Sequence, residues 1–240
     1  LSEAFTRPKI MNELAKQGFS QSYTYFTWRN TKAELIEYLT ELTQTEQKEF
    51  FRPNFWPNTP DILPFALQTG NESVYLQKYF LAATLSSSVG IYGPAYEFLV
   101  HQPMAKGKEE YLNSEKYEVY HWDWEAKNKL TTLITRINHI RKQQESLQQT
   151  NNIVFCKTDN EQLIAYYKFN DAKTDHTLMV CSLNAQNPLQ AVVRLPLEEI
   201  GNQPVKVTDL ITGNSYYWDR EWNFVELHPA LPFHLFKIER

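Results

Sequence analysis

Two acidic residues occupy positions that suit acid–base chemistry. Glu3 lies in the run SEAFTRP at residues 2–8, and Asp61 lies in NTPDIL at residues 58–63. Each acid follows a short apolar or aromatic run and precedes a helical pattern. In a barrel of alternating strands and helices, catalytic carboxylates stand at the carboxyl ends of strands in this way. Two such carboxyl groups can donate and accept protons at one reacting centre.

The segments around the two acids predict alternating strands and helices. Apolar residues recur at helical spacing, which predicts helices over residues 9–16, 32–42, 72–87 and 128–147. Period-two and short apolar patterns predict strands over residues 19–26, 49–55 and 89–92, after the end of another strand at the N-terminus. This order is strand–helix repetition, and it predicts about half of a (β/α)8 barrel in residues 1–150.

The pattern changes near residue 151. Short strands separated by turn residues are expected at 153–156, 163–169, 177–183, 190–195, 205–207, 215–218, 224–227 and 233–238. No long helix is expected among them. Residues 151–240 are therefore predicted to form an antiparallel β-sandwich domain.

Composition excludes several classes of function. The net charge is −4, from 24 basic and 28 acidic residues, and no Lys/Arg-rich run is present, which argues against nucleic-acid binding. No segment reads as a transmembrane helix, so no membrane partner is expected. The histidines and cysteines show no metal-ligand spacing, and no glycine-rich phosphate loop is present, so neither a metal nor another cofactor is expected. Cys156 and Cys181 lie in apolar runs and read as buried thiols, which favours a reducing compartment, the cytoplasm.

The chain begins at Leu1, almost on top of Glu3, and has no initiator Met. We interpret it as the C-terminal part of a longer protein, so the sequence is uninformative about a signal peptide. Half of a barrel would leave open strand edges and an apolar face, and a homodimer is therefore expected.

Several motifs resemble those of the α-1,4-glucan:maltose-1-phosphate maltosyltransferases, a branch of the α-amylase superfamily. The resemblance rests on the runs SEAFTRP (2–8), QSYTYFTWRN (21–30), NTPDIL (58–63), SSSVGIYGP (86–94), GKEEY (107–111), SEKYE (114–118) and DLITG (209–213). It covers nearly all of this chain, but only the last part of the family's length. Pro60 precedes Asp61 as in the maltosyltransferases, whereas ordinary amylases usually carry a His-Asp pair there.

The resemblance implies the C-terminal half of the catalytic barrel followed by a β-sandwich. It also implies transfer of maltosyl from α-maltose 1-phosphate to the non-reducing end of an α-1,4-glucan, with retention by double displacement. Glu3 matches the family's general acid/base, on the fifth strand. Asp61 matches the carboxylate that stabilises the transition state, on the seventh. The nucleophile would lie upstream of Leu1, so the isolated chain is expected to be inactive.

Substrate-binding residues follow from the same resemblance. Lys116 and Tyr117 match residues that hold the donor maltose, and they lie in a long excursion over residues 93–126, where function often resides. Trp28 is expected at the end of the sixth strand, facing the cleft. Asn58 is a further candidate, with orientation of its loop as the favoured role. Two alternatives stay open: an α-amylase-type glycoside hydrolase, and a non-catalytic glucan-binding or structural piece.

Overall fold

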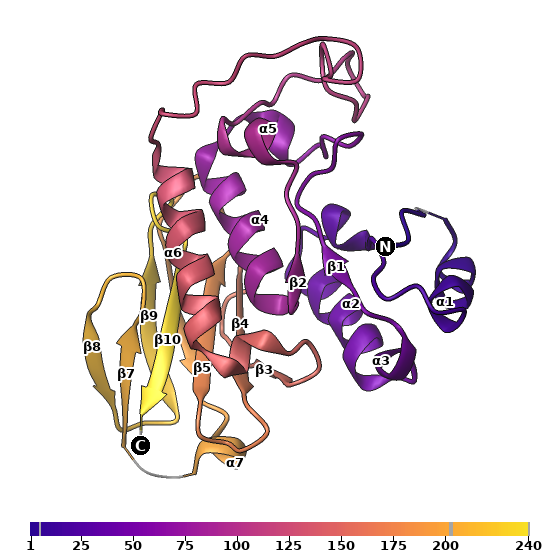
Figure 1. The fold of residues 1–240 in the computed structure, drawn as a ribbon. Coiled ribbons are helices and arrows are strands. Elements are labelled where there is room, and N and C mark those ends of the chain that lie inside the picture. Colours follow the sequence, from indigo (N-terminus) through magenta and orange to yellow (C-terminus); the bar gives the residue numbers. More distant parts are fainter. Residues whose placement is uncertain (5, 202–203, 240) are drawn as a thin grey trace.

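The computed structural model describes residues 1–4, 6–201 and 204–239, so Phe5 of the first motif lies outside the described residues. Helices dominate the first part of the chain and an antiparallel sheet the last part (Figure 1). The α-helices are α1 (Pro8–Lys16), α2 (Lys32–Gln44), α3 (Gln47–Phe50), α4 (Glu72–Leu85), α5 (Gly93–Glu97), α6 (Lys129–Gln143) and α7 (Leu197–Ile200). Short 3₁₀-helices are η1 (Tyr25–Trp28), η2 (Leu67–Thr69) and η3 (Glu145–Gln148).

The long helices begin at capping residues. Thr31 caps α2 in a capping box with Glu34, in which each side chain bonds the other residue's backbone N–H. The Asn71 side chain accepts from the N–H of Ser73 at the start of α4, and Asn128 caps α6 through Thr131. The helices predicted from periodicity at 9–16, 32–42, 72–87 and 128–147 are confirmed, with ends shifted by a few residues.

Four segments of the first part pair in parallel, with helices between them. Ser22 bridges Ser2 on one side and Pro53 on the other. The two-residue strands β1 (Asn54–Phe55) and β2 (Ser88–Val89) continue the ladder. The backbone bonds are regular: Tyr23 N–H donates to Ser2 O at 3.0 Å, and Asn54 N–H donates to Ser22 O at 2.9 Å. The ladder brings the segments that precede Glu3 and Asp61 into one sheet.

The strands predicted over 19–26, 49–55 and 89–92 are wrong in their extent. The first is a single bridge at Ser22, because the backbone turns into η1, where Tyr25 N–H donates to the Tyr38 hydroxyl at 3.2 Å. Part of the second is the helical turn α3, and Pro53 has no N–H for the ladder. The third ends at Val89, since Tyr92 N–H donates to the Asn58 side chain at 3.0 Å instead of to a strand.

The last part of the described chain is an antiparallel β-sandwich. One sheet has the order β3-β4-β5-β10-β7-β8, and β6 pairs with β9 in a second sheet. Their bounds are β3 (Ile153–Cys156), β4 (Leu163–Phe169), β5 (His176–Ser182), β6 (Leu189–Arg194), β7 (Val205–Asp209), β8 (Ser215–Trp218), β9 (Trp222–Leu227) and β10 (Phe233–Glu239). Apolar side chains fill the space between the sheets, including Val180, Val193, Val207 and Val225. Each predicted strand of this region is confirmed to within a few residues.

Helix α4 joins the two parts of the molecule. It is buried almost all round, with α6 on one side and strand β5 of the large sheet on another (Figure 1). The rings of Phe80 on α4 and Phe233 on β10 stack 4.1 Å apart. The buried Lys168 ammonium donates to the carbonyls of Thr84 and Gln149, and burial lowers the pKa of Lys168 to about 7. One apolar core therefore runs from the helices into the sheet.

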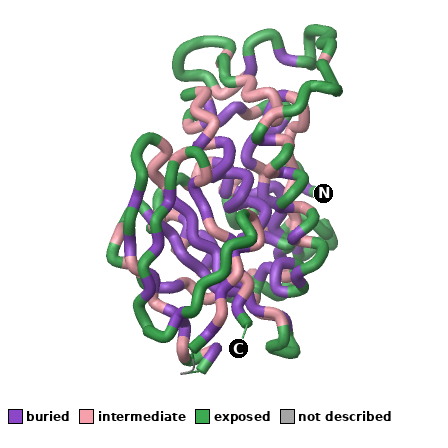
Figure 2. The backbone as a smooth tube through the Cα atoms, turned by 90° about the vertical axis from the view of Figure 1, so that its left-hand side faces the viewer, coloured by how far each residue is buried: buried purple, intermediate pink, exposed green. Residues whose placement is uncertain are grey.

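The excursion between α5 and α6 is the most exposed part of the chain. It lies at the top of the molecule, where Figure 2 shows a mostly exposed loop. Two of its residues are buried anchors, Tyr111 and Ser114. The loop therefore keeps its shape through a few specific contacts. Among the described residues, no helix is long and apolar enough to cross a lipid bilayer.

Candidate active site

Asp61, in the loop after β1, and Lys116, in the excursion between α5 and α6, lie together. The Lys116 ammonium forms an ion pair with Asp61 Oδ1 and a longer one with Glu110 Oε1 at 3.8 Å. Both side chains of the closer pair stay partly exposed. The hydrogen bond to Asp61 is the main reason why the pKa of Lys116 is raised. Lys116 therefore remains a cation beside a carboxylate, in an arrangement that polar ligand groups can reach.

The charges of Glu3 and Asp61 both act on the hydroxyl of Tyr23. Burial raises the pKa of Tyr23, and the negative charges of Glu3 and of Asp61 raise it further. Both carboxylates are therefore within electrostatic reach of the same phenol. The parallel bridge between Ser2 and Ser22 places Glu3 beside Tyr23. Two acids far apart in sequence thus lie at one end of the ladder.

Trp56 packs against the ring of Tyr23. The two rings meet edge to face with centroids 5.0 Å apart, and the Trp56 indole lies directly on Gly90. A Cβ added at Gly90 would stand 2.3 Å from the indole, so only glycine fits at this position. Thr27 Oγ1 donates to Trp56 O at 2.7 Å. The Trp56 ring is therefore held in place against Tyr23 by close packing on Gly90.

Asn58 is fully buried beneath the Asp61 loop. Its Nδ2 donates to Tyr92 O at 3.2 Å and to the Tyr111 hydroxyl at 2.8 Å, and its Oδ1 accepts from Tyr92 N–H at 3.0 Å. Asp61 N–H donates to Thr59 Oγ1 at 3.2 Å. The amide of Asn58 thus ties the loop that carries Asp61 to Tyr92, just before α5, and to Tyr111 in the excursion.

Glu109, a residue of the excursion, holds the Trp28 side chain by hydrogen bonds. The indole N–H of Trp28 donates to both carboxylate oxygens, at 3.0 and 3.1 Å. Glu109 Oε1 also accepts from Phe65 N–H at 3.3 Å, and Glu109 O accepts from Leu63 N–H at 2.6 Å. One residue of the excursion therefore connects Trp28 to the segment just after Asp61.

Tyr117 has an exposed side chain, at 74% of its full accessible area. Its backbone N–H donates to Ser114 O at 2.8 Å, so the turn is ordered while the ring faces solvent. The neighbouring Glu115 bonds Tyr92 and Trp122. Lys116 and Tyr117, both predicted site residues, thus share one turn with Glu115. The Glu115 side chain bonds Tyr92 and Trp122, whereas Lys116 pairs with Asp61.

The structure pairs Lys116 with Asp61, and the charges of Asp61 and Glu3 both act on Tyr23. Hydrogen bonds connect Trp28 to Glu109, and Asn58 to Tyr92 and Tyr111. Sequence reasoning missed Glu109 and Glu115 as members of this network. Both lie in the motifs GKEEY and SEKYE, which carry the family resemblance. The signal was therefore present, but only Lys116 and Tyr117 were assigned roles from it.

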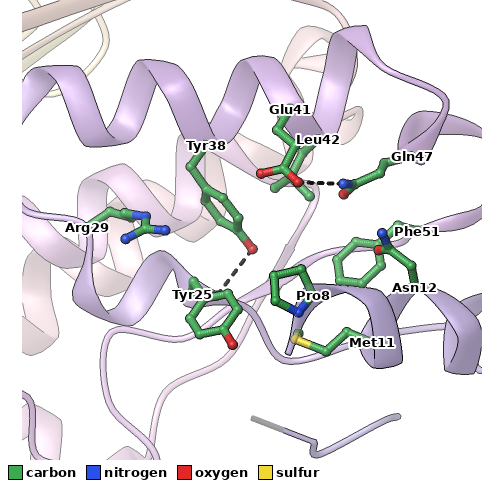
Figure 3. A pocket seen from close by; sticks show the side chains of 10 residues that line it. All are labelled: Pro8, Met11, Asn12, Tyr25, Arg29, Tyr38, Glu41, Leu42, Gln47 and Phe51. Carbon is green, nitrogen blue, oxygen red and sulfur yellow. Dashed lines mark hydrogen bonds between the residues drawn. The ribbon is translucent and has the colours of Figure 1, made fainter. Parts of the chain in front are cut away.

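A cavity of about 250 Å³ lies elsewhere, between α1, α2 and α3. Figure 3 shows Tyr25 and Tyr38 on one side of it, and Met11 and Phe51 on the other. Of the predicted site residues, none lines this cavity. The cavity is therefore separate from Glu3, Asp61 and Lys116. In residues 1–4, 6–201 and 204–239, no group of three or more His, Cys, Asp or Glu side chains could hold a metal ion.

Comparison with known proteins identifies the sequence family. A family model described as "GLGE, C-terminal" matches residues 155–238. The chain is 49% identical over 248 residues to the α-1,4-glucan:maltose-1-phosphate maltosyltransferase of Chlorobaculum tepidum, across 99% of this chain and 37% of that protein. The maltosyltransferase of Methylacidiphilum infernorum is also 49% identical, over 244 residues, across 100% of this chain and 36% of that protein. The chain matches the C-terminal part of this maltosyltransferase family.

Solved structures that resemble this chain include α-amylases. One is an Anoxybacillus α-amylase, with a TM-score of 0.73, 11% identity, and coverage of 98% of this chain and 51% of that chain. Another is the α-amylase of Geobacillus thermoleovorans complexed with acarbose, with a TM-score of 0.73, 12% identity, and coverage of 99% and 52%. The likeness shows an α-amylase-like fold. The chain spans somewhat more than a third of the length of the maltosyltransferases and about half of these amylases.

Proposed function

We propose that this chain is part of a retaining transferase that moves maltosyl from α-maltose 1-phosphate to the non-reducing end of an α-1,4-glucan. Relatives 49% identical along the chain carry the name of this activity. The observation that carries the proposal within the chain is the ion pair of Lys116 with Asp61, at the carboxyl end of a parallel ladder that also carries Glu3.

Glu3 would act as the general acid and then as the general base. In the first displacement, a carboxylate nucleophile from outside this chain attacks the anomeric carbon. The bond to the phosphate oxygen breaks as Glu3 protonates that oxygen. In the second, the Glu3 carboxylate takes the proton of the acceptor 4-hydroxyl, whose oxygen attacks the anomeric carbon and releases the nucleophile. The exposed position of Glu3 beside the Ser2–Ser22 bridge supports this role, because both donor and acceptor must reach it.

Asp61 would stabilise the transition state by accepting hydrogen bonds from sugar hydroxyls of the distorted ring. Lys116 and Tyr117 would hold the maltosyl unit, and Trp28 would form part of the wall. Asn58 would keep the Asp61 loop in place. The ion pair between Lys116 and Asp61 supports this division, since a cation and a carboxylate placed together offer a donor and an acceptor to neighbouring hydroxyls.

We also propose that residues 1–150 form the C-terminal half of a (β/α)8 barrel and residues 151–240 the C-terminal β-sandwich domain. The parallel order of Ser2, Ser22, β1 and β2, with helices between them, supports the barrel. A half-barrel has open edges, so the isolated chain would self-associate, and the whole protein is proposed to be a homodimer. A monodisperse monomer of the isolated chain in light scattering would argue against self-association.

The test is phosphate release from α-maltose 1-phosphate and glycogen by the full-length natural protein, beside its Glu3→Gln variant. We expect release by the wild type and a loss of about 10³-fold or more in the variant, since the amide cannot transfer the proton. The isolated chain should release none. Hydrolysis of α-glucans without phosphate release would instead indicate a hydrolase, and inactivity in both assays would favour a binding or structural role.

A further inference from the structure

We propose that Glu115 is a positioning residue that sets the place of Lys116 and Tyr117 over the site. The inference rests on the proposed function, in which these two residues hold the maltosyl unit. Glu115 itself would touch no sugar. Its carboxylate would act by fixing the turn from which both of its neighbours project.

The contacts of Glu115 form a two-sided clamp. One carboxylate oxygen accepts the Tyr92 hydroxyl proton, and the other accepts from Trp122 Nε1 at 2.9 Å. A carboxylate can accept from two donors at once, and hydrogen bonds to a charged acceptor are the stronger kind. Glu115 thereby connects Tyr92, just before α5, with Trp122 in the later part of the excursion.

Each side of the clamp is itself anchored. Tyr92 exchanges two backbone hydrogen bonds with the buried side chain of Asn58, at 3.0 and 3.2 Å. On the other side, the Trp122 ring stacks on Phe98 at 5.5 Å and on Tyr120 at 5.2 Å between centroids. Glu115 is therefore connected, through Tyr92, to the same Asn58 side chain that holds the Asp61 loop.

Hydrogen bonds within the turn fix the backbone of Lys116 relative to Glu115. Ser114 is buried, its Oγ accepts from Lys116 N–H at 3.3 Å, and its carbonyl accepts from Tyr117 N–H at 2.8 Å. Glu115 points to Tyr92 and Trp122, while Lys116 points to Asp61. An otherwise exposed loop thus delivers an ammonium group to a defined place, as preorganised binding requires.

The experiment compares Glu115→Ala with Glu118→Ala in the full-length natural protein. Glu118 is an exposed acid three residues further along, and no side-chain hydrogen bond or ion pair of it is found among the described residues. The readouts are hydrogen exchange of residues 112–120 and steady-state kinetics with α-maltose 1-phosphate. Glu115→Gln is the conservative variant, because its amide can still accept from Trp122 and donate to the Tyr92 oxygen.

We expect Glu115→Ala to speed exchange of the 112–120 amides by about tenfold or more. Its KM for the donor should rise about tenfold while kcat changes less than about threefold, and Glu115→Gln should recover most of the loss. Equal exchange and equal KM in Glu115→Ala and Glu118→Ala would overturn the proposal. If the wild type released no phosphate, the proposed function would fail, and the exchange comparison alone would decide whether Glu115 orders the turn.

Discussion

Lys116 forms an ion pair with Asp61 across two loops that are far apart in the sequence. Asp61 follows the parallel strand β1, and Lys116 lies in the exposed excursion between α5 and α6. The pair therefore closes the excursion onto the end of the ladder. It also places a cation beside Asp61, one of the two acids whose charge acts on Tyr23.

Replacement of Lys116 tests the role of this pair. We expect Lys116→Met to raise the KM for α-maltose 1-phosphate by about 10- to 100-fold, because a charge-assisted contact to the sugar hydroxyls is lost. Folding stability should change little, since a partly exposed ion pair contributes little to stability. Lys106→Met, in the same excursion, is the matched control and should leave KM unchanged. Similar kinetics in the two variants would remove Lys116 from the site.

Trp28 offers a second test through its indole N–H. Trp28→Phe keeps an aromatic ring but loses both hydrogen bonds to Glu109. We expect a drop of about 3- to 30-fold in kcat/KM, since the ring and the segment after Asp61 would no longer be held together. The exposed Trp124 gives the control variant Trp124→Phe, which removes an indole without such a bond. Equal activity of both variants would show that the Glu109 contact is dispensable.

Asp209 makes the stability of the sandwich depend on pH. Its carboxylate is buried, and accepts from His234 Nδ1, Ile211 N–H and Thr212 Oγ1, each at 3.0 Å. Burial opposes ionisation, but these hydrogen bonds outweigh it and lower the pKa of Asp209. We expect Asp209→Asn to cost about 2–4 kcal/mol of unfolding free energy at pH 7.

The pH profile follows from the direction of that shift. Because the folded pKa lies below the unfolded value of about 3.9, the stabilisation is fully present above that pH and is lost as the pH falls through the folded pKa. Denaturant unfolding should therefore show a gap in unfolding free energy between wild type and Asp209→Asn at pH 5, and this gap should narrow below about pH 4. Asp171→Asn, at an exposed turn, should show no gap. A gap that persisted unchanged to pH 2 would contradict the assignment.

The two thiols should be unreactive in the folded chain. Cys156 and Cys181 are free and buried, and burial raises the pKa of Cys156 to about 12 and that of Cys181 further still. The thiolate is the reactive form, so we expect an aromatic disulfide reagent to label the native protein at least about 100-fold more slowly than the denatured protein. Both thiols should react in denaturant. Rapid labelling of the native chain would show that one strand opens readily.

The sequence determined the local structure where one pattern governs a whole element. Strands β4 and β8 were predicted at their observed residues, because alternation or an apolar run is bounded there by turn residues on both sides. The predicted starts of α2, α4 and α6 fall within one residue of the observed ones, where the side chains of Thr31, Asn71 and Asn128 satisfy free backbone N–H groups. The sequence also predicted Glu3 and Asp61 as candidate catalytic residues, from the motifs at residues 2–8 and 58–63.

Only the tertiary structure decided how far the parallel strands extend and which residues meet. The segments 19–26 and 49–55 contribute single bridges or two-residue strands, because side chains such as Tyr38 and the missing N–H of Pro53 end the ladder. The contacts of Asp61 with Lys116, and of Trp28 with Glu109, join residues that no local periodicity relates. Such contacts depend on the packing of distant segments, so they leave no trace in the spacing of residues along the chain.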